Sequence, residues 1–358
     1  MKRIFILAYA RQNLGDDLFI YMLLRKYPNT SFTINIANTE HANLFEKFHN
    51  VTVILDKERN LTEENANEYD GYIYVGGSIF MEGGVVYNIT EEFLQFLKKC
   101  KKSNIPFCYV SSNFGPSYTQ EYVNLARNVY QNCSDICFRD KYSYNLFKEI
   151  PSVRYAPDLA FTYKPEKPIE RQKNTVGISM IDLAIRKQLI NKEENYYSML
   201  TKNIKNYIDK GKRVYLFSFC KYEGDENSIQ KLMKGIPEKY KNKIQCVNYN
   251  GDIEKFLSIY GSMEYMVCTR FHAMILSSVL GQKCRIMSYS DKIDNVIEDL
   301  DLFDQEVIHF NELEAETQMS LQQFEDIPQE KMKDIAIKAK AQLRMVEKVM
   351  QDGEELGK

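Results

Sequence analysis

The residues best suited to chemistry are an arginine and a histidine that open a helix directly after a buried strand. The segment runs Met266-Val267-Cys268-Thr269-Arg270-Phe271-His272-Ala273-Met274-Ile275-Leu276 and closes at Gly281. We expect Thr269 to cap this helix and Gly281 to end it. A helix N-terminus offers free N–H groups and a partial positive charge. With a guanidinium and an imidazole added, it would form a receptor for phosphate or carboxylate.

Two interpretations of Arg270 and His272 remain open on residue types alone. Cations normally favour helix C-termini, so both residues oppose the field of a first turn, which indicates a bound anion. The structural alternative is an arginine held in a salt bridge within its domain and a histidine packed in its neutral form. Their place at the end of a strand favours the anion site.

A second candidate is Arg139, in the segment Ile136-Cys137-Phe138-Arg139-Asp140-Lys141-Tyr142-Ser143. This segment also has a strand followed by the polar start of a helix, so Arg139 is expected at a strand end in the first half of the chain. The alternative is a structural ion pair between Arg139 and a carboxylate, with Asp140 capping the helix.

Glycine turns follow two further strands. Asn13-Leu14-Gly15-Asp16-Asp17 comes after the first strand, and Gly76-Gly77-Ser78 comes after the fourth. Such glycines allow close backbone approach to a ligand, and Asp16 or Asp17 could accept the proton of a sugar hydroxyl. Ordinary turns and a helix cap explain the same residues without function. The chain has no G-x-G-x-x-G before a helix and no Walker A motif, which argues against dinucleotide and P-loop sites.

The fourth candidate is Ser288-Tyr289-Ser290-Asp291-Lys292, after a strand at Arg285–Met287. Lys292 would add a positive charge for a phosphate, and Tyr289 a stacking face for a sugar. The alternative is a lysine that simply extends into solvent.

Alternating strands and helices must position these residues. Strand-length apolar runs occur at Ile4–Ala8, Phe32–Ile36, Val51–Leu55, Tyr72–Val75 and Phe107–Ser111, with helical patterns at Glu91–Lys102 and Gln120–Gln131. After a proline-containing, charged linker at Tyr163–Asn174, strands follow at Val176–Met180, Val214–Phe219, Ile244–Val247, Tyr265–Cys268 and Cys284–Met287. This alternation predicts parallel βαβ units in doubly wound sheets, where ligands bind beyond the carboxyl ends of the strands.

The predicted fold is therefore α/β, with two Rossmann-like domains facing across a cleft, as in GT-B glycosyltransferases, and a C-terminal helix. The expected ranges are residues 1–165 for the N-terminal Rossmann-like domain, 173–325 for the C-terminal Rossmann-like domain and 326–358 for the C-terminal segment. A surface helix is expected from Pro328 to Gln351, packed by Ile335, Ile337, Leu343, Val346 and Val349.

Length and composition agree with this organisation. At about 150 residues per domain, 358 residues make roughly two domains. The net charge of −2 argues against a nucleic-acid partner, although a small anion can still be held by a local cluster. The mean hydropathy of −0.43 and the lack of a long apolar run argue against a membrane span.

The N-terminus and the cysteines indicate a cytoplasmic protein. Met1-Lys2-Arg3 and the apolar run Ile4–Ala10 are similar to a signal peptide, but the run is short and Arg11 ends it, so we expect a buried first strand. The eight cysteines include no Cys-x-x-Cys pair and no Cys/His spacing typical of zinc. Reduced, mostly buried thiols and no metal site are therefore expected.

Taken together, the motifs resemble those of the polysaccharide pyruvyl transferase family. They are Asn13-Leu14-Gly15-Asp16, Gly76-Gly77-Ser78, Gly115-Pro116, Arg139-Asp140-Lys141-Tyr142-Ser143, Pro157-Asp158-Leu159-Ala160-Phe161, Arg270-Phe271-His272 and Tyr289-Ser290-Asp291-Lys292. The chain departs from the family pattern at Phe271, where leucine is usual, in a shorter glycine-rich turn, and at Ser111-Ser112-Asn113, where Gln-Gly is common. These departures affect the expected acceptor more than the donor, and Asn113 is counted among the substrate-binding candidates.

The resemblance implies transfer of a pyruvyl group from phosphoenolpyruvate to two hydroxyls of a sugar, forming a cyclic ketal without a nucleotide cofactor. In this interpretation His272 is the general acid, because histidine titrates near neutrality. Arg270 and Arg139 hold phosphate and carboxylate with help from Lys292, and Asp16 or Asp17 accepts the proton of the acceptor hydroxyl.

The expected acceptor is a sugar of a cell-surface or capsular polysaccharide or of its lipid-linked precursor. Peripheral contact with the inner face of the membrane and the oligomeric state stay open. One alternative is a GT-B glycosyltransferase that uses a nucleotide sugar, for which Glu298 is the only candidate ribose ligand. Another is a catalytically silent glycan-binding protein, which would gain little from an anion site.

Overall fold

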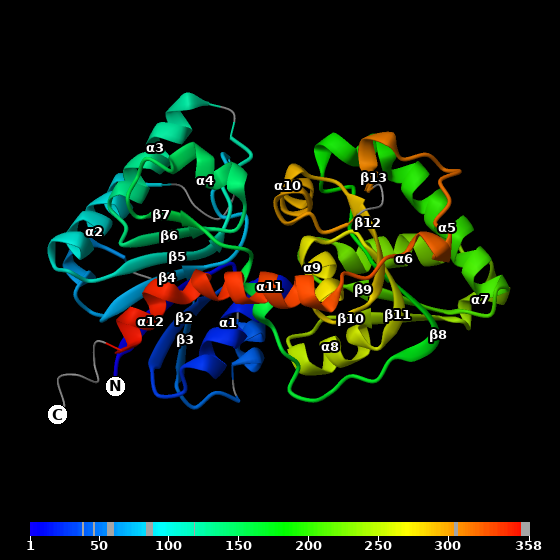
Figure 1. The fold of residues 1–358 in the computed structure, drawn as a ribbon, viewed down its shortest axis with the longest axis horizontal. Helices are drawn as coiled ribbons and strands as arrows, with labels where there is room; N and C mark the ends of the chain where they lie inside the picture. Colours follow the sequence, from blue (N-terminus) through cyan, green and yellow to red (C-terminus); the bar gives the residue numbers. More distant parts are fainter. Residues whose placement is uncertain are drawn as a thin grey trace. The chain divides into compact units, whose positions relative to one another are not determined.

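The computed structural model describes residues 1–37, 39–45, 47–55, 61–83, 89–117, 119–303 and 307–351. The chain divides into two compact units. Unit 1 comprises Met1–Arg11, Gly15–Thr162 and Ile335–Lys358, and unit 2 comprises Gln12–Leu14 and Tyr163–Asp334. Both are layered α/β structures built on a parallel sheet (Figure 1). Compared with the expected ranges, the short Gln12–Leu14 segment belongs to unit 2 and most of the C-terminal segment to unit 1.

Unit 1 contains, among its described residues, a seven-stranded parallel sheet in the order β3-β2-β1-β4-β5-β6-β7. Its strands are β1 (Arg3–Ala8), β2 (Ser31–Ile36), β3 (Val51–Leu55), β4 (Gly71–Val75), β5 (Phe107–Ser112), β6 (Asp135–Phe138) and β7 (Val153–Tyr155). Its helical segments are α1 (Leu14–Lys26), η1 (Thr39–Leu44), η3 (Glu63–Asn65), α2 (Glu91–Lys102), α3 (Gln120–Gln131), α4 (Lys141–Phe147) and η4 (Leu159–Thr162). Strand order reverses between β1 and β4, which creates a topological switch point.

The central strands of unit 1 consist of continuous runs of apolar residues because both faces of the sheet are covered. One face packs on α2 and α3 through a core rich in aromatic residues. There the rings of Tyr74 and Tyr109 stack at 5.3 Å between centroids, and Tyr72 meets Phe96 edge to face at 5.0 Å. Parallel sheets generally require such double coverage, so the strand patterns show little alternation.

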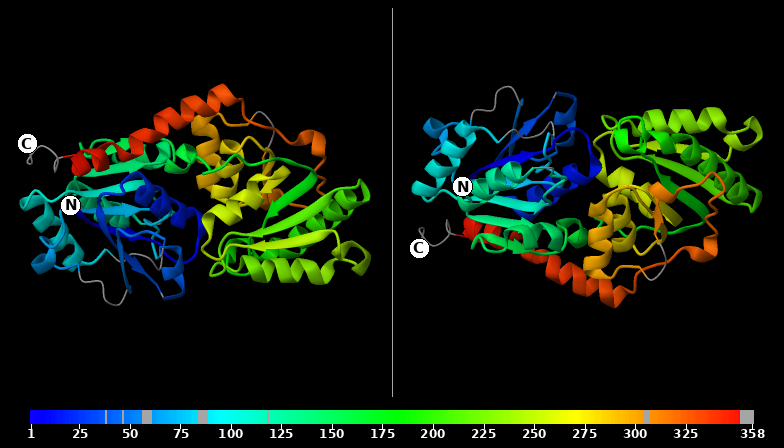
Figure 2. Two further views of the ribbon diagram at one scale, coloured as in Figure 1. Left: turned by 90° about the horizontal axis from the view of Figure 1, so that it is seen from below. Right: turned by 90° about the horizontal axis from the view of Figure 1, so that it is seen from above.

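The C-terminal segment belongs to unit 1 from Ile335 onward (Figure 2). It consists of α11 (Gln329–Ala339), η8 (Lys340–Leu343) and α12 (Arg344–Gln351) rather than the single expected helix. Ile335, Leu343, Val346 and Val349 are buried as predicted. The prediction for Ile337 was wrong, since its side chain is 64% exposed. Ile337 lies two positions after the buried Ile335 in α11, and therefore on the opposite face of the helix from Ile335 and Ala339.

Unit 2 contains, within the described part of the chain, a six-stranded sheet in the order β10-β9-β8-β11-β12-β13. Its strands are β8 (Gln172–Ser179), β9 (Arg213–Ser218), β10 (Ile244–Asn248), β11 (Met263–Cys268), β12 (Lys283–Ser288) and β13 (Ile308–His309). The helical segments are η5 (Lys187–Lys192), α5 (Glu193–Asp209), α6 (Asp225–Gly235), α7 (Glu238–Lys241), α8 (Ile253–Gly261), α9 (Phe271–Val279), α10 (Asp291–Leu300), η6 (Phe310–Glu312) and η7 (Leu321–Gln323). The switch point here lies between β8 and β11.

The core of unit 2 also covers both faces of its sheet. On one face, β8 and β9 pack against Tyr196 and Leu200 of α5 and Ile229 of α6. On the other, the Phe217 ring lies edge to face with Phe256 and Tyr260 of α8, at 5.6 and 5.1 Å between centroids. This packing fixes the ends of the strands from which the site residues project.

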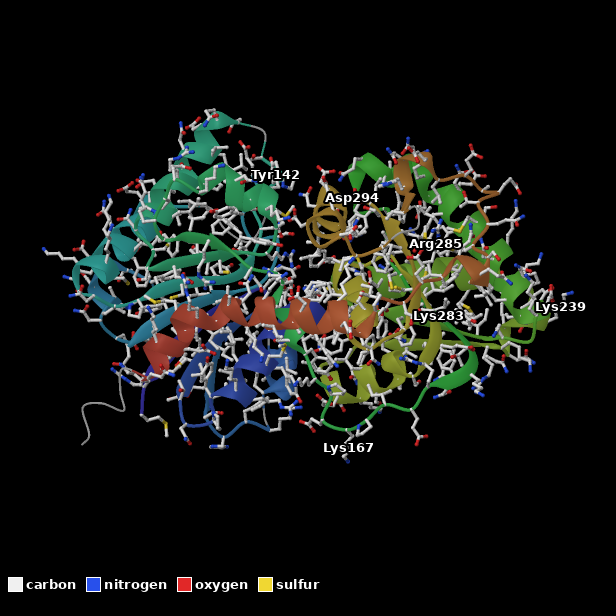
Figure 3. All side chains as sticks on the ribbon, in the orientation of Figure 1. Tyr142, Lys167, Lys239, Lys283, Arg285 and Asp294 are labelled. Carbon is white, nitrogen blue, oxygen red and sulfur yellow. The ribbon has the colours of Figure 1, made fainter. Side chains whose placement is uncertain are left out.

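Sequence and structure agree on the linker and the cysteines. Residues 163–171 carry no helix or strand, and Lys167 points away from the chain (Figure 3). Strand β8 begins at Gln172, slightly earlier than expected, because the Gln172 amide donates to the Ser262 carbonyl oxygen at 2.7 Å. All eight cysteines are free and only Cys246 is exposed. No helix of the described residues is long and apolar enough to cross a membrane.

Candidate functional site

The predicted site residues of unit 1 gather at the carboxyl ends of neighbouring strands. Asp16 follows β1, Gly77 follows β4, Asn113 follows β5, Arg139 follows β6 and Asp158 follows β7. These five strands are adjacent in the sheet, so residues from positions 16 to 158 meet at one edge. We call these five residues the unit 1 cluster.

Arg139 is the centre of the unit 1 cluster. Its side chain is only 2% exposed, and its Nη1 lies 3.0 Å from Oδ2 of the fully buried Asp158. Its Nη2 donates to Oδ1 of Asn113 at 2.6 Å. The geometry is that of the structural ion pair considered from the sequence. The Arg139 charge is therefore compensated inside unit 1, and the guanidinium orients the Asn113 amide.

Gly77 is required for the close approach of this guanidinium. A Cβ at position 77 would lie 2.8 Å from Nη2 and 3.0 Å from Nη1 of Arg139. The Gly77 amide also donates to Oδ1 of Asp16 at 3.5 Å. The glycine turn after β4 thus links the arginine to the first turn of α1, where both Asp16 and Asp17 are buried.

The remaining candidates of unit 1 support this arrangement. The Ser78 hydroxyl donates to Oδ1 of Asn113 at 3.1 Å, so this oxygen accepts two hydrogen bonds and the amide nitrogen stays as the donor. Asp140 caps α4 as predicted, accepting from the Ser143 amide at 2.7 Å. The Ser143 hydroxyl in turn accepts from the Phe114 amide at 2.8 Å, which fixes the backbone beside Asn113.

Unit 2 brings together a second set of strand-end residues around Arg270. Its side chain is buried, its Nη1 pairs with Glu223, and its Nη2 pairs with Asp225. Both carboxylates follow β9, whereas Arg270 follows β11. Its Nε has no hydrogen-bond partner among the described residues. Arg270 therefore has one buried counter-ion, Asp225, one partly exposed counter-ion, Glu223, and one unused N–H donor.

The two carboxylates differ in their environment. Burial by itself would raise the pKa of Glu223, but the Arg270 and Arg186 guanidiniums outweigh it and hold that pKa at about 2. Burial raises the pKa of Asp225 to about 6 despite its contact with Arg270. Asp225 also accepts hydrogen bonds from the Phe219 and Cys220 amides at 2.9 and 3.0 Å. Asp225 can therefore change its charge near neutrality, whereas Glu223 stays ionised.

Tyr289 and Lys292 join this set, together with an arginine that the sequence analysis did not single out. The Arg186 guanidinium lies 5.1 Å from the centre of the Tyr289 ring, and the Lys292 ammonium lies 5.8 Å from it. The Nη2 of Arg186 lies 3.2 Å from Oε2 of Glu223. Burial would raise the pKa of Tyr289, but Lys292, Arg186 and Arg270 lower it. We call Arg186, Glu223, Asp225, Arg270, Tyr289 and Lys292 the unit 2 cluster.

The start of α9 differs from the prediction in its cap. Arg270, not Thr269, is the N-cap residue, and its side chain makes no capping hydrogen bond. Thr269 instead bonds the Ser179 carbonyl oxygen, and the Ser179 hydroxyl accepts from the Thr269 amide at 2.8 Å. The Thr269 hydroxyl is thus committed to β8, which leaves the first turn of α9 without a side-chain cap.

His272 lies in this uncapped first turn and is half-buried. Its ring packs edge to face on Phe271, with 5.1 Å between centroids. The end of α9 matches the prediction, because Gly281 adopts a φ of +65°, the left-handed conformation of a helix stop.

Arg186, Glu223, Asp225 and Asp158 are the functional candidates that residue-by-residue reasoning missed. Glu223 and Asp225 flank Gly224, five and seven positions after the end of β9, so two carboxylates around a glycine were an available signal. Asp158 was quoted only as part of a motif. Arg186 lies seven positions after the end of β8 and carries no local signal.

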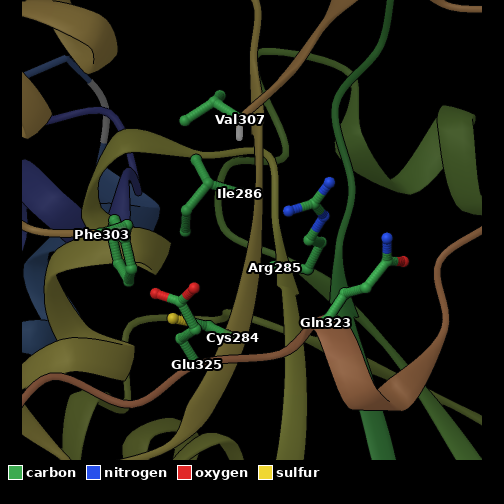
Figure 4. Close-up of a pocket in the computed structure, with 7 residues that line it drawn as sticks. All are labelled: Cys284, Arg285, Ile286, Phe303, Val307, Gln323 and Glu325. Carbon is green, nitrogen blue, oxygen red and sulfur yellow. The ribbon is translucent and has the colours of Figure 1, made fainter. Parts of the chain in front are cut away.

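Two hollows lie away from these clusters. One, of about 10 Å³, is bounded by Cys284, Arg285, Ile286, Phe303, Val307, Gln323 and Glu325. Arg285 points to the other side of β12 from Glu325 (Figure 4). This first hollow can hold no more than a water molecule. The other, of about 470 Å³, lies at the amino ends of the unit 1 strands, beside Lys2, Pro106 and Ser134. Ligands of doubly wound sheets bind at the opposite edge.

Solved structures with the same fold support the two-unit architecture. The chain resembles Anabaena Alr3699/HepE in complex with UDP and glucose, at 14% identity and a TM-score of 0.53, covering 99% of each chain. It also resembles a putative UDP-N-acetylglucosamine 2-epimerase from Listeria monocytogenes, at 12% identity and a TM-score of 0.58, covering 99% of this chain and 97% of that one. The Methanocaldococcus jannaschii UDP-GlcNAc 2-epimerase in complex with UDP-GlcNAc and UDP matches at 14% identity and a TM-score of 0.51, covering 94% and 98%.

These similarities show the predicted fold, two parallel-sheet α/β units of the GT-B type, and nothing about the reaction. The sequence model of one family is more specific. The model described as polysaccharide pyruvyl transferase matches residues 13–291, a range that includes the whole unit 1 cluster and every member of the unit 2 cluster except Lys292. The chain belongs to the polysaccharide pyruvyl transferase family.

Proposed function

We propose that this enzyme transfers a pyruvyl group from phosphoenolpyruvate to two hydroxyls of a sugar, forming a cyclic ketal. The observation that carries the proposal is the unit 2 cluster, where Arg186, Arg270 and Lys292 surround Tyr289 beside the uncapped first turn of α9. Phosphoenolpyruvate carries a phosphate and a carboxylate on one small carbon frame. Several cations suit both of its anionic groups.

The charges of the cluster favour an anion. Three cations face two carboxylates, so the cluster has a net charge of +1 when all five groups are ionised. Glu223 and Asp225 hold Arg270 in place before any ligand binds, so little side-chain entropy is lost on binding. Arg270 keeps its unused Nε donor, and Lys292 and Arg186 supply further donors.

His272 supplies the proton in this proposal. The imidazolium gives a proton to the methylene carbon of phosphoenolpyruvate, leaving a methyl group and a cation at the neighbouring carbon. A sugar hydroxyl adds to that carbon and loses its proton. The second hydroxyl then replaces the phosphate, which leaves as inorganic phosphate, and the two hydroxyl protons restore the imidazolium and protonate the leaving group. An anion bound at the N-terminus of α9 would favour the charged imidazole.

We assign the acceptor hydroxyls to the unit 1 cluster. Asp16 and Asp17, in the first turn of α1, are the candidate bases, and the amide nitrogen of Asn113 is a donor for a sugar oxygen. Arg139, expected from the sequence to hold the donor, has its guanidinium committed to Asp158 and Asn113. Its role in this proposal is to place Asn113.

The proposed acceptor is a sugar of a cell-surface or capsular polysaccharide, free or on a lipid-linked precursor. The enzyme would act in the cytoplasm or at the inner face of the membrane. Family membership supports a saccharide acceptor, and the polar strand-end residues of unit 1 suit one.

Calorimetry and mass spectrometry together test the proposal. Phosphoenolpyruvate is expected to bind, and UDP-sugars are not. With galactose-, mannose- and N-acetylmannosamine-type lipid-linked acceptors, one acceptor should gain the mass of a pyruvyl ketal while inorganic phosphate is released. Binding of a UDP-sugar without binding of phosphoenolpyruvate would favour the glycosyltransferase alternative and contradict the proposal.

Anion binding at the unit 2 cluster should strengthen as the pH falls through 6. The pKa of Asp225 is raised to about 6, so protonation removes one carboxylate from Arg270 and increases the net charge of the cluster. Sulfate is the probe, because phosphoenolpyruvate changes its own charge in this range. We expect roughly tenfold tighter sulfate binding at pH 5 than at pH 8, equivalent to about 1.4 kcal/mol.

The variant Asp225→Asn should reduce this pH dependence, whereas Glu226→Gln, one residue further along α6, should keep it in full. An unchanged slope in Asp225→Asn would disprove the assignment. The same shift affects stability. The pKa of Asp225 in the folded protein lies above its ordinary value of 3.8. The contribution of Asp225 to the free energy of unfolding is therefore fully present below about pH 4 and is lost as the pH rises through 6.

A further inference from the structure

We propose that Gln342 is a positioning residue that sets the geometry of the unit 1 cluster. Gln342 lies in η8 of the C-terminal segment, outside the range matched by the family model. Its catalytic consequence rests on the proposed function, whereas its structural consequence does not.

The Gln342 side chain is fully buried and bonds three backbone groups from three strand ends. Its Oε1 accepts from the Ser111 amide at 2.9 Å. Its Nε2 donates to the carbonyl oxygens of Ala156 at 2.7 Å and Phe138 at 3.4 Å. One carboxamide thus satisfies a donor and two acceptors of β5, β6 and the segment after β7.

Each of these backbone groups lies one or two positions before a member of the unit 1 cluster. Ser111 precedes Asn113 by two positions, Phe138 immediately precedes Arg139, and Ala156 precedes Asp158 by two positions. These three cluster residues are the ones joined by the Arg139 guanidinium. A shift of any one strand end would change the Arg139–Asp158 or Arg139–Asn113 distance.

Ser111 shows why an external bond is needed at this place. It has a φ of +56°, a left-handed conformation that costs energy for a residue with a Cβ. Its amide is held by Gln342, and its hydroxyl accepts from the Leu159 amide at 2.8 Å. This turn aims the chain from β5 toward Asn113, and the two hydrogen bonds maintain it.

A second side chain, that of Arg154, fixes the position of the backbone at Gln342. Arg154 of β7 makes two bonds to Asp135 of β6, from Nε at 2.6 Å and from Nη2 at 2.7 Å. The same guanidinium donates to the carbonyl oxygens of Ala341 and, at 3.1 Å, Gln342. The backbone of η8 is therefore anchored to the sheet independently of the Gln342 side chain.

Glutamine is chemically suited to this position. Burial of a polar side chain is unfavourable unless its hydrogen bonds are made, and an apolar residue would fill the same space without them. Leucine or methionine would leave the Ser111 amide and the Ala156 carbonyl oxygen without these hydrogen bonds, whereas the Phe138 carbonyl oxygen would keep its bond from the Ala156 amide at 3.1 Å. An ionised glutamate would keep the acceptor and lose both donors, whereas a protonated glutamate regains one donor.

The first test is amide hydrogen exchange in the full-length protein, with Gln342→Met, Gln342→Leu and the control Leu343→Ala. The two Gln342 variants should speed exchange at Ser111 and Leu159 by at least tenfold. Leu343→Ala removes packing from the adjacent buried residue and should not single out these amides. Unchanged exchange at Ser111 in a folded Gln342 variant would overturn the proposal, whatever reaction the enzyme catalyses.

The second test separates positioning from stability through kinetics. Gln342→Met should lower kcat/KM for the acceptor by about tenfold or more, with KM for phosphoenolpyruvate within about twofold. Leu343→Ala should lower the unfolding midpoint by as much or more. It should nevertheless change kcat/KM for the acceptor and KM for phosphoenolpyruvate far less. Gln342→Glu should regain activity as the pH falls from 9 to 6, because the buried carboxyl takes up a proton and donates again. Wild-type kinetics in Gln342→Met, or a flat pH profile in Gln342→Glu, would contradict the catalytic part.

Discussion

Replacing Arg270 by alanine is expected to abolish phosphoenolpyruvate binding and to destabilise the protein by about 3–5 kcal/mol. The loss of stability arises because the buried Asp225 would remain without its counter-ion, while Glu223 would keep only its pair with Arg186. The loss of binding arises because the guanidinium belongs to the proposed anion site. Calorimetry with phosphoenolpyruvate measures the loss of binding, and urea unfolding measures the loss of stability.

A combined variant distinguishes the two roles of Arg270. In Arg270→Ala/Glu223→Gln/Asp225→Asn no unpaired carboxylate remains, so most of the stability should return. If Arg270 binds the donor, phosphoenolpyruvate binding should stay lost in this variant. If Arg270 only neutralises the two carboxylates, binding should return with stability, and the proposed donor site would then be wrong.

The second large effect is expected from His272→Ala, which should lower kcat by about 10²–10⁴-fold. Phosphoenolpyruvate binding should stay within roughly tenfold of the wild type, because the cations of the unit 2 cluster are unchanged. The residue is only half-buried, so stability should change far less than in Arg270→Ala. Steady-state kinetics and calorimetry measure the two quantities separately.

The matched control for this prediction is His309→Ala, which replaces a half-buried histidine of the same unit near Asp294. Its kcat should stay close to that of the wild type. In heavy water, the wild-type product should carry solvent deuterium in its methyl group, because the proposed acid exchanges with solvent. A near-normal kcat in His272→Ala would rule out histidine as the proton donor.

Much of the fold followed from local patterns. The strands expected at Val51–Leu55 and Phe107–Ser111 and the helices at Glu91–Lys102 and Gln120–Gln131 lie within a residue of those observed. Apolar runs of strand length recur because the sheets are covered on both faces, and the helices carry amphipathic patterns because one face packs on a sheet. The two switch points follow from strand order, which the sequence does not specify.

Local patterns were less reliable where a side chain had a choice of partners. Thr269 is a good N-cap by type, but it bonds Ser179 of β8 instead. Ile337 is apolar, but it lies two positions after the buried Ile335 of α11 and so faces away from the protein. A partner distant in the sequence decided the first outcome, and the geometry of the helix decided the second.

The sequence by itself determined which residues stand at the ends of the strands, because each strand and its following turn are encoded in a short continuous segment. Tertiary structure alone decided which of those residues meet. Arg270 and Asp225 are 45 positions apart, Arg139 and Asp158 are 19 apart, and Ser111 and Gln342 are 231 apart. Such pairs form because the order of strands in a sheet brings distant strand ends together. Burial then requires each charge or amide there to find a partner, so the partners of both arginines became visible only in the folded chain.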